Sequence, residues 1–256
     1  MYIERCLASL KKQRYNGTFE ILVVKGGNRA QARNFGIKQA EGKIIAFIDS
    51  DCVASENWLP LLVHDLNKDK TLGGMGGVNL SPENGPILGK AIDFVFSSYL
   101  GSLGSASLHV PSKSKPIHAL ACINSAFWKH IIKDINGFDE EFELCEDTNL
   151  SYKVRQSGHK LLFNPHVLVW HYRRDSIKRF AKQFFLYGLG RMRSIMTNKV
   201  YASKSAIIPF LIVLIFPVIA WLLPLAAVSG LAVYLMAIFI KVYKVPYKLK
   251  KQVFCY

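Results

Sequence analysis

The first two-thirds of the chain alternates apolar runs with amphipathic segments. Apolar positions at helical spacing predict a helix over residues 2–13. Short apolar runs at 19–24 and 43–48 predict two buried strands, with a helix over 28–40 between them that begins at Asn28. Strand, helix and strand in this order predict a parallel βαβ unit and therefore an α/β domain.

The pattern continues through the rest of this domain. The glycine-rich segment 73–80 predicts a strand that allows close approach of backbone or ligand, and the polar, serine-rich segment 105–115 predicts a loop that could act as a lid. Further helices are expected at 55–67, 86–103, 125–132 and 146–156, and a strand at 160–170.

A second region begins near residue 173. Residues 176–193 have an apolar face and a basic face, which predicts an amphipathic helix at a membrane interface. Residues 206–240 contain no charge, and a single helix of this length would measure about 52 Å, well beyond a ~30 Å hydrocarbon core. Two short spans at 207–223 and 225–240 fit a transmembrane hairpin better, and a buried pair of core helices is the alternative.

Charge is distributed unevenly. Residues 1–172 carry 19 basic and 17 acidic residues, whereas residues 173–256 carry 14 basic residues and one acid. The excess of positive charge therefore flanks the apolar stretch, which argues against nucleic-acid binding by the globular domain. Basic residues on both sides of the hairpin place both flanks, and the domain before them, in the cytoplasm. The five cysteines lack metal-ligand spacing and are expected to be reduced thiols.

The most informative motif is Asp49-Ser50-Asp51, directly after the apolar run 44–48. Two carboxylates at the carboxyl end of a strand lie where open α/β sheets bind ligands, and oxygen ligands suit Mg²⁺ or Mn²⁺. An ordinary turn is the alternative interpretation. A second acidic pair, Glu146-Asp147, opens the helix at 146–156, where stabilisation of the helix dipole is the alternative.

Five segments in order resemble family 2 glycosyltransferases of the GT-A fold, especially membrane-anchored members that build exopolysaccharides or lipid-linked glycans. The resemblance covers about residues 2–193. The segments are IAFIDSDC (45–52), CINSAFW (122–128), NGFDEEF (136–142), EDTNL (146–150) and NPHVLVWH (164–171).

The resemblance implies roles for individual residues on the donor side. Asp51 would bind Mg²⁺ or Mn²⁺ on the donor diphosphate, and Asp49 would contact the ribose or the water shell of the metal. His171 would contact the metal or the diphosphate. Arg33 and Asn34 lie on the helix that borders the nucleotide, where a solvated basic face is the alternative for Arg33.

Other roles concern the acceptor and the membrane. Asp147 would be the general base and Glu146 would orient the site. Asn124, Trp128 and Gln183 are expected to contact the acceptor, and Arg191 the donor. For Gln183 and Arg191, attachment to anionic lipid is the alternative.

The chain also departs from the family pattern. The family usually opens with a strand that holds the nucleotide base, whereas this chain starts at the helix that follows, and Lys25-Gly26-Gly27 replaces the base-binding aspartate after the second strand. We therefore expect an N-terminally incomplete GT-A domain over 1–172. It is followed by an interfacial segment (173–205), the hairpin (206–241) and a basic cytoplasmic tail (242–256).

The expected activity is that of an inverting, hexosyltransferase-type enzyme. It would move a sugar from a nucleotide-diphosphate donor to a lipid-linked or glycan acceptor at the cytoplasmic membrane face. The alternative is a degenerate, non-catalytic membrane-anchored protein that binds partners or lipid.

Overall fold

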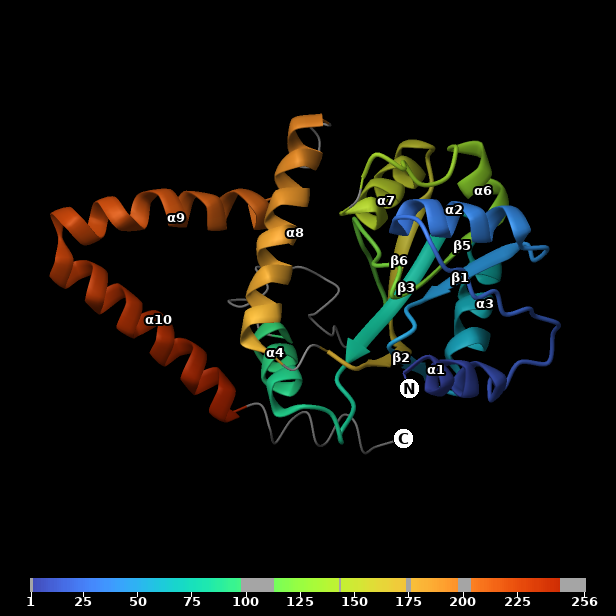
Figure 1. Cartoon of the computed structure of the whole chain (residues 1–256), viewed down its shortest axis with the longest axis horizontal. Helices are drawn as coiled ribbons and strands as arrows, with labels where there is room; N and C mark the ends of the chain where they lie inside the picture. The colour runs from blue at the N-terminus through green and yellow to red at the C-terminus, as the bar shows by residue number, and fades with distance from the viewer. Residues whose placement is uncertain (1, 98–112, 143, 174–175, 198–203, 245–256) are drawn as a thin grey trace.

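The computed structural model describes residues 2–97, 113–142, 144–173, 176–197 and 204–244 (Figure 1). A six-stranded mixed sheet has the order β1-β5-β3-β6-β2, with β4 paired to β6. The strands are β1 (Ile44–Ile48), β2 (Cys52–Ala54), β3 (Leu72–Leu80), β4 (Lys115–Pro116), β5 (Asn124–Trp128) and β6 (Lys160–His171). The helices of this part are α1 (Tyr2–Lys11), α2 (Arg29–Gln39), α3 (Trp58–Lys68), α4 (Ile87–Ser97), α6 (Lys129–Asp134) and α7 (Glu146–Gln156). The predicted α/β mixed-sheet domain is confirmed.

Two apolar cores lie on opposite faces of this sheet. On one face, α1 and α3 pack against the strands through residues such as Leu62 and Met75. On the other face, α2, α6 and α7 pack through residues such as Ile37 and Leu150. Neighbouring residues of β5 divide between the two cores, Ala126 in the first and Phe127 in the second, as the alternation of a strand requires. The domain is therefore a three-layer sandwich.

The sheet direction decides where the predicted site residues lie. β3 and β6 run parallel, and β5 runs antiparallel to β1 and β3. β1, β3 and β6 consequently point the same way, and Asp49 and His171 lie at their carboxyl ends. The opposite edge of the sheet is where β3 and β6 begin.

Residues 19–24 do not form the predicted strand. β1 pairs with β5 alone among the described residues, so the parallel βαβ unit is not formed. Leu22 and Val23 are about half exposed, and the Glu20 carboxylate instead accepts hydrogen bonds from the backbone N–H groups of Glu41 and Gly42. A side-chain contact to the turn before β1 thus takes the place of a backbone ladder.

The prediction of a helix over 125–132 was wrong in its first half. Residues 124–128 form β5, and only Lys129–Asp134 is helical. The run Ala126-Phe127-Trp128 is apolar without interruption because β5 is covered on both faces, and such a run does not distinguish a buried strand from a helix.

Three helices follow the domain, α8 (Ile177–Thr197), α9 (Lys204–Leu222) and α10 (Pro224–Lys244). The break between α9 and α10 lies at Leu223, between the two expected spans at 207–223 and 225–240. In Figure 1, α9 leads away from α8 and α10 returns towards α4. The transmembrane character of the hairpin is not supported, because among the described residues no helix meets the length and apolarity needed to cross a bilayer. The expected lid at 105–115 lies mostly outside the described residues, as does the tail at 245–256.

A bulge between β3 and β6 requires a glycine. The pairing register shifts between Gly76 and Val78 of β3. Opposite this step, residues 164–167 of β6 form the bulge, because Gly76 pairs with Phe163 and Val78 pairs with Leu168. A Cβ on Gly77 would lie 1.9 Å from the Val167 carbonyl oxygen. The backbone of β6 therefore approaches β3 more closely than any side chain allows.

We predict that Gly77→Ala lowers the free energy of unfolding by at least ~2 kcal/mol, since overpacking of a rigid backbone cannot be relieved by a rotamer change. Denaturant unfolding followed by circular dichroism measures it. Gly188→Ala is the matched control, because a Cβ on Gly188 in α8 meets nothing within 4 Å. Equal stability of both variants would refute the close approach at Gly77.

Candidate active site

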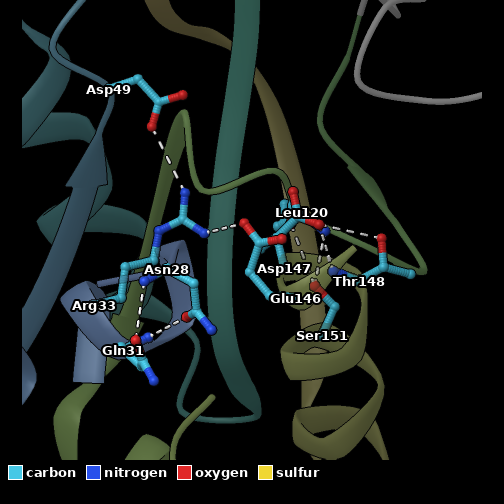
Figure 2. Close-up of polar contacts among 9 residues, drawn as sticks. All are labelled: Asn28, Gln31, Arg33, Asp49, Leu120, Glu146, Asp147, Thr148 and Ser151. Atoms are coloured by element: carbon cyan, nitrogen blue, oxygen red, sulfur yellow. Dashed lines mark hydrogen bonds and ion pairs between the residues drawn. The ribbon is translucent and has the colours of Figure 1, made fainter. Parts of the chain in front are cut away.

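The acidic pair that opens α7 lies at the carboxyl edge of the sheet. Cys145, just before the helix, has left-handed backbone geometry with φ of 64° and makes no side-chain capping bond. Glu146 is buried, with 3% of its side chain exposed. The Asp147 carboxylate accepts hydrogen bonds from the Thr148 N–H at 2.7 Å and the Thr148 hydroxyl at 3.3 Å (Figure 2). Neighbouring carboxylates thus have different surroundings.

Arg33 connects this pair to the first acidic motif. One guanidinium nitrogen contacts the Glu146 carboxylate at 2.5 Å, and the other lies 3.7 Å from the Asp49 carboxylate (Figure 2). The Arg33 side chain is 16% exposed. A planar guanidinium can serve two acceptors at once, so Arg33 bridges the two acidic motifs.

The start of α2 fixes the position of Arg33. The Asn28 side chain accepts from the Gln31 N–H, and the Gln31 side chain accepts from the Asn28 N–H, which is a capping box (Figure 2). Asn28 also donates to the Glu140 carbonyl across the site. These bonds orient the first turn of α2, one turn before Arg33.

Asn34 holds the other side of this turn. Its amide donates to the Phe138 carbonyl and the Glu140 carboxylate, and its oxygen accepts from the Phe138 N–H. The side chain is fully used in tying α2 to the loop before α7. A role for Asn34 in nucleotide binding would therefore be indirect.

Burial and charge shift the pKa values of the three aspartates in different directions. Burial, then the charge of Glu146, raises the pKa of Asp147. Burial also raises the pKa of Asp49, although Arg33 opposes the shift. Burial alone would raise the pKa of Asp51, but the hydrogen bond and charge of His171 outweigh it and lower the pKa. Asp51 is thus held as a carboxylate, while Asp147 holds a proton more readily.

Asp51 and His171 form a candidate cation site. His171 Nε2 lies 3.4 Å from Asp51 Oδ2, and 43% of the Asp51 side chain is exposed. Ligand atoms of Asp51, Cys52 and His171 all lie within 4.8 Å of one another. Cys52 is buried, and burial followed by the charges of Asp51 and Asp49 raises its pKa, so it stays a thiol. Carboxylate oxygens and an imidazole nitrogen remain, and this donor set fits Mg²⁺ or Mn²⁺.

Two predicted acceptor contacts, Asn124 and Trp128, lie at opposite ends of β5. Asn124 is 2% exposed. Its amide donates to the Val78 and Val167 carbonyls, and its oxygen accepts from the Trp58 indole. Asn124 therefore satisfies the backbone of the β3–β6 bulge. Asn124 pairs with Ile48 at the carboxyl edge of the sheet, and Trp128 pairs with Ile44 at the opposite edge. Contact of either residue with an acceptor stays a prediction.

Of the two predicted contacts on α8, the structure describes the side chain of Gln183 alone. Gln183 donates to the Tyr187 hydroxyl on the same helix at 2.6 Å, and Arg191 belongs to α8. Gly190 was missed by sequence reasoning. A Cβ there would lie 2.7 Å from Leu144 Cβ and 3.2 Å from Cys145 Sγ, so α8 touches the loop that leads into Glu146. The only signal was a glycine pair, G-L-G, inside an amphipathic helix.

We predict that Arg33→Met lowers the free energy of unfolding by about 3 kcal/mol, because it leaves the buried Glu146 carboxylate without its partner. Met keeps the apolar stem of the side chain. Arg29→Met is the matched control, since Arg29 is exposed on the same helix, and it should leave stability nearly unchanged. Equal denaturant midpoints for the two variants would contradict the ion pair.

Two relatives of the chain are named as a polysaccharide synthase and a glycosyltransferase. It is 26% identical over 172 residues to the poly-beta-1,6-N-acetyl-D-glucosamine synthase of Staphylococcus epidermidis, covering 67% of this chain and 40% of that protein. It is 30% identical over 162 residues to the pre-mycofactocin glycosyltransferase of Mycobacterium tuberculosis, covering 62% of this chain and 33% of that protein. The chain therefore spans less than half the length of these relatives.

Solved structures give a weaker likeness. S. aureus TarS 1–349 in complex with UDP matches with a TM-score of 0.47 and 17% identity, covering 75% of this chain and 62% of that one. The family described as "Glycosyltransferase like family 2" matches residues 13–185, more than half of the chain. The protein therefore belongs to this glycosyltransferase family.

Proposed function

We propose that the protein transfers a sugar, with inversion at the anomeric carbon, from a nucleotide-diphosphate donor to a glycan or lipid-linked acceptor. The observation that carries the proposal is the division of carboxylates around Arg33. Asp51 and His171 face each other on one side of it, and Glu146 and Asp147 lie on the other. The named relatives, a synthase of poly-N-acetylglucosamine and a transferase acting on a mycofactocin precursor, support sugar transfer as the reaction class.

The donor half binds and orients the diphosphate. Asp51 and His171 would hold Mg²⁺ or Mn²⁺, which when bound neutralises charge developing on the leaving diphosphate. Asp49 links this pair to Arg33. Its carboxylate contacts the Arg33 guanidinium and also interacts with the charges of Asp51 and His171. Arg33 adds fixed positive charge to the same region, which favours an anionic donor.

The acceptor half moves a proton. Asp147 would take the proton from the acceptor hydroxyl as that oxygen attacks the anomeric carbon, which is the role of a general base. The raised pKa of Asp147 suits the task, because a more basic carboxylate accepts the proton more readily. One displacement from the face opposite the diphosphate inverts the anomeric centre. Arg33 holds Glu146 in place. Because Glu146 and Asp147 are adjacent in the sequence, this ion pair also positions Asp147.

We further propose that α8, α9 and α10 associate with membrane lipid and hold the domain at the cytoplasmic face. Large apolar side chains of α10 such as Val233, Met236 and Phe239 are more than 60% exposed. Basic residues lie before and after this apolar stretch in the sequence, a composition that attracts anionic lipid surfaces.

Asp147→Asn should reduce sugar transfer by 10²- to 10⁴-fold, the usual contribution of a general base. The assay measures nucleotide released from a panel of nucleotide-sugars with Mn²⁺ and a glycan acceptor. Asp134→Asn, an exposed aspartate on α6, is the control and should keep full activity. Equally slow release by wild type and Asp147→Asn with every donor would sink the proposal and favour a non-catalytic binding protein.

Glu146→Gln should move the acidic limb of the pH–rate profile to lower pH. The negative charge of Glu146 contributes to the raised pKa of Asp147, so its removal lowers that pKa and keeps the base deprotonated further into acid. Glu141→Gln, in the loop before α7 and exposed, is the control and should leave the limb in place. A limb that moves to higher pH, or does not move, would contradict the assignment of Asp147 as the base.

A further inference from the structure

A cleft lies at the edge of the sheet opposite the carboxylates. It has a volume of about 300 Å³ and is lined by Lys70, Trp128, His130, Ile131 and His159. The lining comes from the turn before β3, the end of β5, α6 and the turn before β6. In Figure 1 this is the end of the sheet near α6, where β3 starts. The length of β5 alone separates Trp128 from the carboxyl edge by roughly 13 Å.

The core of the domain holds the walls of this cleft in place. Ile131 is 3% exposed and belongs to the core under α6. His159 packs against the start of β3 so closely that a Cβ on Gly73 would lie 2.8 Å from His159 Cβ. The His159 N–H also donates to the Val154 carbonyl at the end of α7. The cleft is therefore formed by well-packed elements rather than by a long loop.

The polar groups in the cleft favour an anion. Lys70 Nζ lies 4.9 Å from the centre of the Trp128 ring and donates one hydrogen bond to Asn67 Oδ1 at 3.2 Å. An ammonium has three donors, so two more can reach a ligand. None of the lining residues is acidic. The nearest carboxylate in sequence, Asp69, accepts hydrogen bonds from the N–H and hydroxyl of Thr71.

The rings in the cleft favour a flat ligand. The Trp128 and His130 rings lie 5.9 Å apart at 45°, and His159 supplies a second imidazole. Aromatic faces of this kind stack on planar groups, as they do on bases in nucleic-acid complexes. The volume is at the lower end of small-molecule pockets. It suits a single ring with one phosphate.

We propose that this cleft binds a small phosphate ester that carries a flat ring, at a site separate from the carboxylate edge. Lys70 supplies the charge from its position over the Trp128 ring, His130 and His159 supply N–H donors to the phosphate oxygens, and the remaining surface of the Trp128 ring supplies apolar contact. A charge-assisted contact to phosphate is the strongest of these interactions. None of the cleft residues takes part in the proposed transfer reaction.

The test is an NMR titration of the purified full chain with phenyl phosphate, inorganic phosphate and benzyl alcohol, which carry both groups, the anion alone and the ring alone. Saturable binding of phenyl phosphate is expected, with inorganic phosphate at least fivefold weaker and benzyl alcohol weaker still. Lys70→Gln and His159→Gln should each weaken phenyl phosphate binding at least tenfold. Lys68→Gln, an exposed lysine at the end of α3, is the matched control and should bind as wild type does.

Far-ultraviolet circular dichroism confirms that each variant is folded. Asp51→Asn should leave phenyl phosphate binding unchanged, and its loss in that variant would place the ligand at the carboxylate edge and overturn the proposal. Unchanged binding by Lys70→Gln and His159→Gln would overturn it as well. Equal affinity for benzyl alcohol and phenyl phosphate would show that the cleft does not select an anion.

Discussion

The buried ion pair between Arg33 and Glu146 is the contact on which the arrangement of the site depends. It joins α2, on one side of β1, to the first turn of α7, which the sequence places more than 100 residues later. Taking two such groups out of water is costly unless each has a partner. The capping box at Asn28 and the left-handed turn at Cys145 bring the two helix starts into register so that the pair can form.

This pair also lies between two aspartates whose pKa values shift in opposite directions. On the strand side, Asp51 faces His171 and stays ionised, as a cation ligand must. On the helix side, Asp147 is half-buried next to another carboxylate, and the raised pKa means that it binds a proton more strongly than a solvated aspartate. Arg33 balances the charge between them, since it contacts both Glu146 and Asp49. A transfer reaction needs this difference, because one acid must stay charged while the other accepts a proton.

Much of this could be predicted from the sequence. The apolar run of β1 ending in two aspartates located the carboxyl edge, and α7 begins at Glu146 as expected. The strand at 19–24 failed because pairing depends on a neighbour, and the apolar residues Leu22 and Val23 have none among the described residues. The pattern of apolar residues within a segment does not show whether a partner strand lies beside it.

The positions of other side chains could not be predicted for a different physical reason. Asn124 and Trp128 share one motif, yet an antiparallel strand carries them to opposite edges of the sheet. Asn124 is used by a backbone bulge whose existence depends on the close approach at Gly77, a tertiary feature. The contact of Gly190 with Leu144 and Cys145 likewise depends on where α8 crosses the domain. Such contacts depend on tertiary packing, so the local spacing of residues in the sequence does not predict them.

The two acidic motifs are proposed to have different functions, cation binding for Asp51 and proton transfer for Asp147. An electron paramagnetic resonance titration with Mn²⁺ distinguishes these functions in wild type, Asp51→Asn and Asp147→Asn, each in the presence of a nucleoside diphosphate. We expect Asp51→Asn to weaken Mn²⁺ binding at least tenfold, and Asp147→Asn to bind Mn²⁺ as wild type does. Loss of Mn²⁺ binding in Asp147→Asn with retention in Asp51→Asn would contradict the proposal.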